Sequence, residues 1–304
     1  MHASYPLNRF VVSAYRNFVV IMAPRELLDT VTRRLADAGV PAAEYAARFL
    51  VTEILGCSAA ELFSATTGAV PDAAAERIFD AADQCTRRMP VQFAIGYAYF
   101  RDLRLRVTPD VMIPRPETEQ LVDLVLSRIR HLYAPRVLDI GTGSGCIALS
   151  IRKEHPQAQV TGCDISQAAL EVAKVNAESQ GLEVKFVEAD VLAVEDGTWR
   201  SFRGFDVVVS NPPYIPDQER IALQPEVRDH EPVVALYCGA DPLKFYRAIA
   251  DIVQAGALRP AGLIALETHA DYASQVAGLF EGVGHVEIRE DYAGLSRFVL
   301  VRYP

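Results

Sequence analysis

The hydrophobic pattern divides the chain into a helical first part and a second part in which strands and helices alternate. Between residues 24 and 88, apolar side chains recur every three or four positions, as they do on one face of amphipathic helices. From residue 115 onward, short apolar runs alternate with helical stretches. That order predicts an α/β fold, in which a seven-stranded, mostly parallel, doubly wound sheet has helices on both faces.

Proline positions and local alternation set the domain boundaries. Residues 93–107 alternate apolar and polar side chains, which predicts a β-hairpin between the two parts. Ser58 and Glu61 have the spacing of a capping box, so we expect a helix to begin there. The small helical domain has no cofactor features, and we expect it to grip a protein partner. The predicted divisions are an extension at 1–21, the helical domain at 22–90, a hairpin linker at 91–114 and the sheet domain at 115–304.

A glycine-rich turn follows the first predicted strand of the sheet domain. Residues 137–140 predict a buried strand, and a helical pattern begins at Cys146. Glycines between them let the backbone approach a ligand that a Cβ would exclude. A dinucleotide fingerprint would need glycine at position 146, so this turn suits a cofactor without a pyrophosphate. We assign the whole turn to cofactor binding: Gly141, Thr142, Gly143, Ser144 and Gly145.

Acidic residues end the next two predicted strands. Asp164 follows the strand at 159–163, where it is placed to accept both hydroxyls of a ribose; a surface acid is the alternative. Asp190 follows the strand at 184–188, where it meets an adenine amino group or simply caps a helix. Ligands of such sheets bind beyond the carboxyl ends of the strands. The glycine turn and the two acids therefore predict one site.

The fourth predicted strand, 205–210, ends in Asn211-Pro212-Pro213-Tyr214. Two prolines cannot donate to a β-ladder, so the strand stops there. What remains is an amide side chain, carbonyl acceptors and an aromatic ring, a set that suits a flat substrate with an NH2 group. A plain strand-terminating turn is the alternative, and the cofactor motif upstream disfavours it.

Residues 137–214 resemble an S-adenosylmethionine-dependent methyltransferase of the seven-stranded type that modifies planar nitrogens. Over about residues 22–304 the chain resembles the HemK/PrmC family, which methylates the glutamine side-chain amide of peptide chain release factors. It departs from the family pattern at 238–243 and at Thr268-His269, both away from the cofactor motif. The narrower match rests on Pro90-Val91-Gln92-Phe93, Gly96, Phe100, the run from Ile113 to Glu119, Glu231-Pro232, Ala235-Leu236, Asp291, Gly294 and Arg297.

The resemblance implies an acceptor site for the glutamine of the Gly-Gly-Gln motif in class-1 release factors. An amide nitrogen is a poor nucleophile because its lone pair is delocalised into the carbonyl. The Asn211 side-chain oxygen and the Pro212 carbonyl each accept one N–H of that amide and fix the nitrogen toward the methyl group. Tyr214, with Pro213 beside it, forms a flat wall against the amide, and Phe100 covers the other side.

The resemblance also implies S-adenosylmethionine as the cofactor. Val191 then packs on the adenine, and Asn211 borders the cofactor as well as the acceptor. Asp139 either helps to hold the methionine amino group or orients the glycine turn; the sequence leaves both roles open.

Charge bears on the rival functions. A DNA adenine or RNA guanine methyltransferase would use the same acceptor motif but needs a surface for a polyanion. The net charge is −9, with 8 Lys/Arg against 13 Asp/Glu after Tyr214 and 7 against 10 in residues 22–90. A methyltransferase for a ribosomal protein's glutamine is the closer rival, disfavoured by the run from Ile113 to Glu119. A scaffold that binds the cofactor without catalysis is disfavoured by the intact motifs.

Cysteines and apolar runs bear on the compartment. The five cysteines form no Cys-x-x-Cys pair, which favours a cytoplasmic protein without a metal site. No apolar run approaches the ~20 residues that span a bilayer. Residues 1–21 hold only a short, interrupted apolar stretch, unlike a secretory signal. We interpret them as a start site placed too far upstream or a frayed extension; a packed additional helix is the alternative.

Overall fold

The computed structural model describes residues 22–63, 69–194 and 198–304, and the extension predicted at 1–21 lies outside them. The chain forms two compact units, Met1–Ile95 and Gly96–Pro304. The helices are α1 (Pro24–Asp37), α2 (Ala43–Leu55), α3 (Ala59–Leu62), α4 (Asp72–Thr86), α5 (Val91–Ile95), α6 (Pro116–Ile129), α7 (Cys146–Glu154), α8 (Gln167–Gln180), α9 (Pro225–His230), α10 (Val233–Leu236), α11 (Lys244–Ile252) and α12 (Ala273–Gly278). The strands are β1 (Tyr97–Phe100), β2 (Leu103–Arg106), β3 (Arg136–Ile140), β4 (Gln159–Asp164), β5 (Lys185–Glu188), β6 (Phe205–Ser210), β7 (Ile215–Pro216), β8 (Tyr237–Gly239), β9 (Leu258–Glu267), β10 (His285–Glu290) and β11 (Ser296–Arg302).

The first unit is a helical domain with its own core. Apolar residues of α1, α2 and α4 that share one helix face are buried together, among them Leu27, Leu50 and Ile78. The predicted capping box at the start of α3 is confirmed. The Glu61 N–H donates to Ser58 Oγ at 3.2 Å, and the Ser58 N–H donates to a Glu61 carboxylate oxygen at 2.7 Å.

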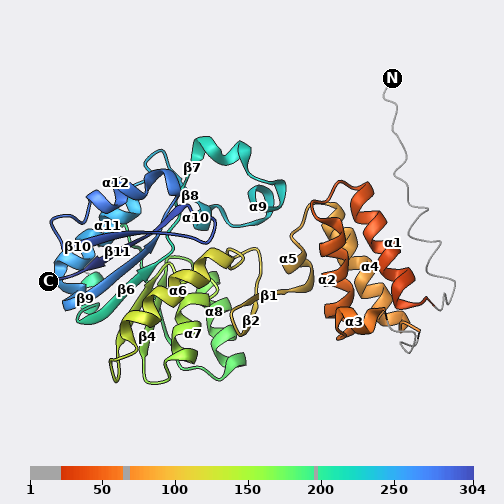
Figure 1. Ribbon diagram of the computed structural model, residues 1–304, viewed down its shortest axis with the longest axis horizontal. Helices are drawn as coiled ribbons and strands as arrows, with labels where there is room; N and C mark the ends of the chain where they lie inside the picture. The colour runs from red at the N-terminus through yellow and green to blue at the C-terminus, as the bar shows by residue number, and fades with distance from the viewer. Residues whose placement is uncertain (1–21, 64–68, 195–197) are drawn as a thin grey trace. The chain divides into compact units, whose positions relative to one another are not determined.

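The second unit is built on a seven-stranded sheet with the order β10-β11-β9-β6-β3-β4-β5 (Figure 1). The five strands from β9 to β5 are parallel, whereas β11 runs antiparallel to both β9 and β10. The predicted α/β fold is therefore confirmed. In sequence order, β4 and β5 are added on one side of β3, and β6 and β9 are then added on its other side. Ligands of such sheets bind where the order reverses, beyond the carboxyl ends of β3 and its neighbours.

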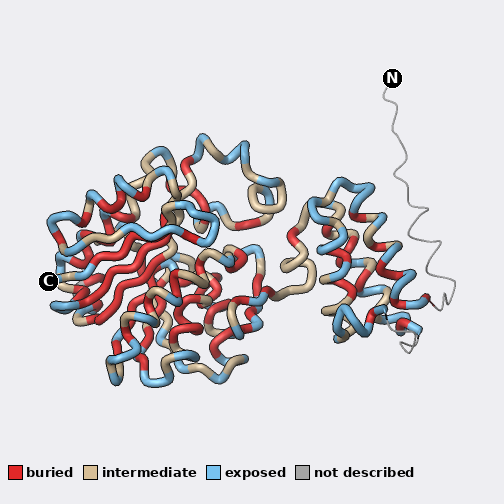
Figure 2. The backbone as a smooth tube through the Cα atoms, viewed as in Figure 1, coloured by how far each residue is buried: buried red, intermediate tan, exposed pale blue. Residues whose placement is uncertain are grey.

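Successive side chains of the central strands point to opposite faces of the sheet and pack into two separate cores. Leu138 of β3 packs in a cluster with residues of α11 and α12, and Val137 packs in the cluster that includes α6 and α7. All six residues of β6 are buried (Figure 2), because helices cover both faces of the sheet. This double burial explains why 205–210 is a continuous apolar run. No helix in the ranges that the structure describes is long and apolar enough to span a membrane.

A hairpin was expected at 93–107; residues 97–106 form it within the second unit, whereas residues 93–95 belong to α5 of the first unit. β1 pairs antiparallel with β2, and Phe100 lies opposite Leu103. Both side chains are 1% exposed and pack with Leu121 of α6. The hairpin therefore contributes to the core that supports the sheet.

Candidate active site

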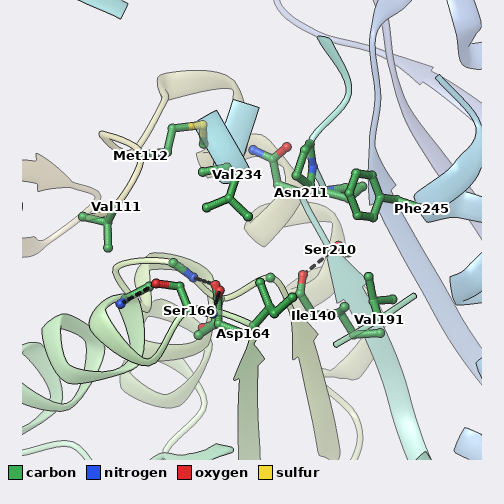
Figure 3. A pocket seen from close by; sticks show the side chains of 18 of the residues that line it. Val111, Met112, Ile140, Asp164, Ser166, Val191, Ser210, Asn211, Val234 and Phe245 are labelled. Carbon is green, nitrogen blue, oxygen red and sulfur yellow. Dashed lines mark hydrogen bonds between the residues drawn. The ribbon is translucent and has the colours of Figure 1, made fainter. Parts of the chain in front are cut away.

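A cavity of about 360 Å³ lies beyond the carboxyl ends of β3, β4, β5 and β6 (Figure 3). Asp164, Ile140 and Val191 lie at the strand ends, and Val111, Met112 and Val234 lie across the cavity from them (Figure 3). Ten of the residues assigned to the site from the sequence line this one cavity: Gly141, Thr142, Gly143, Ser144, Asp164, Asp190, Val191, Asn211, Pro212 and Pro213.

The glycine turn wraps one side of this cavity because its backbone adopts left-handed conformations. Gly141, Gly143 and Gly145 have φ of 72°, 54° and 83°, values that other residues adopt only with strain. A Cβ built on Gly141 or Gly143 would meet no atom within 4 Å, so the space above the turn is open. Gly145 does not line the cavity; a Cβ there would lie 3.2 Å from Leu149 Cδ1 on α7. The turn thus offers open backbone that a small cofactor can approach.

Gly162 of β4 supports the glycine turn, a role that the sequence reasoning missed. A Cβ there would lie 2.8 Å from Thr142 Oγ1 and 3.0 Å from two ring carbons of Phe186. The Gly141 and Thr142 N–H groups donate to the Cys163 carbonyl at 2.8 and 2.9 Å, so the turn rests directly on the end of β4. Glycine at 162 makes this close approach sterically allowed. Its only signal in the sequence was a glycine inside a predicted strand.

Asp139 lies beneath the turn and is fully buried. Its carboxylate accepts a hydrogen bond from Thr142 Oγ1 at 2.7 Å. Burial raises the pKa of Asp139 to about 7, while the hydrogen bond from Thr142 lowers it. Asp139 does not line the cavity. Of the two roles left open by the sequence, this geometry supports orientation of the glycine turn.

Asp164 presents a partly buried carboxylate to the cavity. One oxygen accepts from the Gly143 N–H and the other from the Ser166 N–H, each at 2.9 Å. Each carboxylate oxygen can accept a second hydrogen bond, which suits the two hydroxyls of a ribose. Burial raises the pKa of Asp164, and the backbone N–H groups counteract that rise. Ser166 also caps α8 by accepting from the Ala169 N–H at 3.2 Å.

Asp190 and Val191 border the cavity after β5. Asp190 accepts from the Leu192 N–H through its side chain at 2.8 Å, and its carbonyl accepts from Trp199 Nε1 at 2.9 Å. The local turn therefore accounts for part of what Asp190 does. Val191 is placed at the cavity wall, where an apolar side chain can pack on a flat ring.

Asn211 stands at the end of β6, where the acceptor site was predicted. The preceding Ser210 donates from Oγ to the Ile140 carbonyl at 2.7 Å and so ties the ends of β6 and β3 together (Figure 3). The Asn211 amide nitrogen donates to Thr118 Oγ1 at 3.1 Å. The Asn211 side chain therefore lines the cavity with one N–H of its amide bonded to Thr118, which lines the same cavity.

The two aromatic residues assigned to substrate binding do not line the cavity. Tyr214 packs against the core, and its hydroxyl donates to Glu267 at 3.4 Å; burial raises its pKa. The assignment of Phe100 to substrate binding is wrong. Phe100 is 1% exposed and lies in the core between the sheet and α6, where it cannot cover a substrate amide. Its apolar neighbours on the hairpin make a closed packing environment that the sequence pattern alone did not separate from a binding site.

The run from Ile113 to Glu119 borders the cavity, which Pro114 and Thr118 line. Arg115 forms a salt bridge of 2.5 Å with Glu231, which is 5% exposed and also accepts from the Ile113 N–H at 3.1 Å. Glu119 accepts from the Arg101 N–H at 2.7 Å. These contacts favour bracing of the cavity wall as the role of the run. The sequence reasoning did not assign Val111, Met112, Val233, Val234 and Phe245 to the cavity that they line.

The strand order and the glycine turn, acids and acceptor motif around one cavity define an S-adenosylmethionine-dependent methyltransferase. Residues 117–225 match the Methyltransferase small domain, and residues 26–96 match the PrmC N-terminal domain. The catalytic domain of hMettl16 in complex with MAT2A 3′UTR hairpin 1 superposes with a TM-score of 0.53 at 19% identity, covering 75% of this chain and 80% of that one. At that identity the likeness shows the fold alone. In the part of the chain that the structure describes, no group of three or more His, Cys, Asp or Glu side chains is arranged to hold a metal ion.

Curated relatives identify the family. The Release factor glutamine methyltransferase of Deinococcus radiodurans is 40% identical over 92% of this chain and 99% of its own length. That of Moorella thermoacetica is 38% identical over 92% of this chain and 98% of its own length. That of Caulobacter vibrioides is 38% identical over 88% of this chain and 92% of its own length. The chain belongs to the release factor glutamine methyltransferase family, as its motifs indicated, and its cofactor is S-adenosylmethionine.

Proposed function

We propose that this chain methylates the side-chain amide nitrogen of the glutamine in the Gly-Gly-Gln motif of class-1 peptide chain release factors, in the cytoplasm. The names of its relatives support this substrate, at 38–40% identity over nearly their whole length. The observation that carries the proposal is the orientation of Asn211. One N–H of its amide is bonded to Thr118, and we assign its oxygen as the acceptor for the substrate amide.

The acceptor site formed by Asn211 and Pro212 suits a primary amide. Asn211 Oδ1 and the Pro212 carbonyl lie at the end of β6, and residues 212 and 213 have no N–H to compete for these acceptors. Each oxygen accepts one N–H of the substrate amide. The nitrogen is thereby held in place, and the positive charge that it acquires during attack is stabilised. Such orientation is worth ~7–11 kcal/mol in favourable intramolecular reactions, so the site requires no strong base before methyl transfer.

The cofactor residues border the same cavity as the acceptor residues. When bound, S-adenosylmethionine supplies an electrophilic methyl group on a sulfonium. Asp164 accepts the ribose hydroxyls, Val191 and Asp190 border the adenine, and the glycine turn leaves room for the remainder. Because Asn211 lines this cavity too, the methyl donor and the substrate amide share one site.

The charge of the chain favours a protein substrate. With a net charge of −9, it is poorly suited to hold a polyanion such as DNA or RNA. An acidic enzyme is well suited to a partner that carries basic patches, as proteins that work against ribosomal RNA do. We assign the grip on that partner to the helical unit, which matches the PrmC N-terminal domain.

Methyl transfer from radiolabelled S-adenosylmethionine tests the proposal. The acceptors are a class-1 release factor, the same factor with its Gly-Gly-Gln glutamine replaced by alanine, ribosomal proteins and DNA. Label is expected on the first acceptor alone, and its tryptic peptide should carry one methyl group on glutamine. Equal labelling of the alanine variant, or labelling of DNA or ribosomal proteins instead, would refute the assigned substrate.

A further inference from the structure

A series of hydrogen-bonded side chains leads from Asn211 to the buried carboxylate of Glu267. The Asn211 nitrogen donates to Thr118 Oγ1 at 3.1 Å, and Thr118 Oγ1 donates to Glu267 Oε2 at 2.8 Å. Thr118 and Glu267 are each 1% exposed. Thr118 lies in the first turn of α6 and Glu267 is the last residue of β9. These hydrogen bonds connect three segments that are remote in sequence, and the bond between Thr118 and Glu267 is buried away from bulk water.

The chemistry of the three groups fixes the direction of the hydrogen bonds, which run from Asn211 through Thr118 to Glu267. An ionised carboxylate can only accept, and a hydroxyl has a single proton to donate. Thr118 therefore gives its proton to Glu267 and is left to accept from Asn211. An amide donates only through its nitrogen, so this nitrogen turns toward Thr118 and the oxygen is left to accept from another donor.

Protonation of the carboxylate removes that direction. A neutral Glu267 can donate to Thr118, which can then donate to the oxygen of Asn211. The amide is then free to take either orientation, and in the reversed one its N–H groups face the substrate. Two NH2 groups facing one another cannot form the bond that holds the substrate nitrogen.

We infer that Glu267 and Thr118 are positioning residues that hold the Asn211 carboxamide with its oxygen toward the substrate amide. They act through Asn211. The inference rests on the proposed function, because it assumes that the acceptor is a group with N–H donors. It adds to that function the reason why the Asn211 amide keeps one of its two orientations.

Several charged or titratable groups face Glu267 from neighbouring elements. Burial raises its pKa to about 7 and the nearby Glu117 of α6 acts in the same direction, whereas the Thr118 hydrogen bond, the Arg297 charge and the Tyr214 hydroxyl lower it. Arg297 of β11 is itself bonded to Asp291 at 3.2 Å. The ionised form of Glu267 fixes the direction of the hydrogen bonds. The orientation of the Asn211 amide is therefore lost as the pH falls through about 7.

The first test removes the Thr118 hydroxyl, which links Asn211 to Glu267. Thr118→Val keeps the shape of the side chain but not the hydroxyl, and Thr118→Ser keeps the hydroxyl. We expect Thr118→Val to lower the maximal rate of release-factor methylation about tenfold, as for the loss of one hydrogen bond to a charged network. Thr118→Ser should remain within about threefold of the wild type. Cofactor dissociation constants, measured by calorimetry, should change by less than about threefold in both. A Thr118→Val enzyme with the wild-type rate would overturn the inference.

The second test follows the rate against pH. The wild-type rate should fall as the pH is lowered through about 7, whereas Glu267→Gln, which cannot ionise, should be slower and independent of pH in that range. Asp139 also has a pKa raised to about 7. A fall in rate that persists in Glu267→Gln would therefore belong to another group and would contradict the role of Glu267. Tyr246→Phe is the matched control: it removes a buried hydroxyl that donates to the Glu267 backbone carbonyl at 3.0 Å, and it should keep the wild-type pH profile.

The third test reads the orientation without catalysis. The side-chain amide signal of Asn211, assigned from its loss in Asn211→Ala, is followed by NMR in the full chain without release factor. We expect it to shift with a midpoint near pH 7 in the wild type and to remain constant in Thr118→Val. A signal that is constant in the wild type would refute the inference even if methylation were normal. Absence of release-factor methylation by a wild type whose signal titrates would refute the proposed substrate instead.

Discussion

Asp139 gives the sharpest prediction about the stability of the second unit. It is fully buried below the glycine turn, and burial raises its pKa from 3.8 to about 7. A carboxyl with a raised pKa in the folded state contributes stability that is fully present below its unfolded pKa and is lost as the pH rises through its folded pKa. Asp139→Asn keeps an acceptor oxygen for the Thr142 hydroxyl and cannot ionise. We therefore expect this variant to escape the loss.

The two pKa values set the magnitude. The rise from 3.8 to about 7 corresponds to ~4 kcal/mol between the two protonation states. Between pH 5 and pH 8, ~2.5 kcal/mol of this difference develops, because part of it is already present at pH 5. The free energy of unfolding of Asp139→Asn, relative to the wild type, should therefore rise by ~2–3 kcal/mol over this range.

Trp199 makes the measurement specific to the right unit. It is the only tryptophan of the chain, and it is 3% exposed in a core of the second unit. Its fluorescence during urea unfolding at pH 5, 6.5 and 8 reports the stability of the unit that contains Asp139. Asp251→Asn, on an exposed position of α11, is the control that replaces an aspartate outside the core. If Asp139→Asn and the wild type kept a constant difference across the three pH values, the reasoning about burial would be wrong.

Three further predictions concern the site. Asn211→Ala should abolish methylation with the cofactor dissociation constant unchanged within a few-fold, and substantial turnover by this variant would disprove its role as acceptor. Gly162→Ala should weaken cofactor binding about tenfold, because its Cβ would lie 2.8 Å from Thr142 Oγ1; Gly278→Ala, where a Cβ meets nothing within 4 Å, is the calorimetric control. Phe100→Ala should cost ~3–5 kcal/mol of unfolding free energy, as other buried phenylalanines do. A variant that instead kept its stability and only lost affinity for the release factor would restore Phe100 to the binding site.

Local patterns were sufficient for the four parallel strands that end at the site and for much of the cofactor site. The apolar run at 205–210 and the two prolines after it predict a strand and its end, and β6 ends at Ser210. Glycine spacing predicts the turn at 141–145, and the structure brings it to the cavity together with Asp164. These features depend on neighbours in the chain: the steric freedom of glycine, the missing N–H of proline and the run of apolar residues typical of a central strand.

What the sequence by itself determined was therefore the class of fold, the family and the residues at the strand ends. Only the tertiary structure decided which side chains meet across the sheet. Thr118, Asn211 and Glu267 come from three distant segments, and no local pattern records the hydrogen bonds that join them. Phe100 likewise looks the same in sequence whether it faces a ligand or a core. The physical reason is that burial and hydrogen-bond direction depend on the packing of remote elements, which the chain acquires only when the sheet assembles.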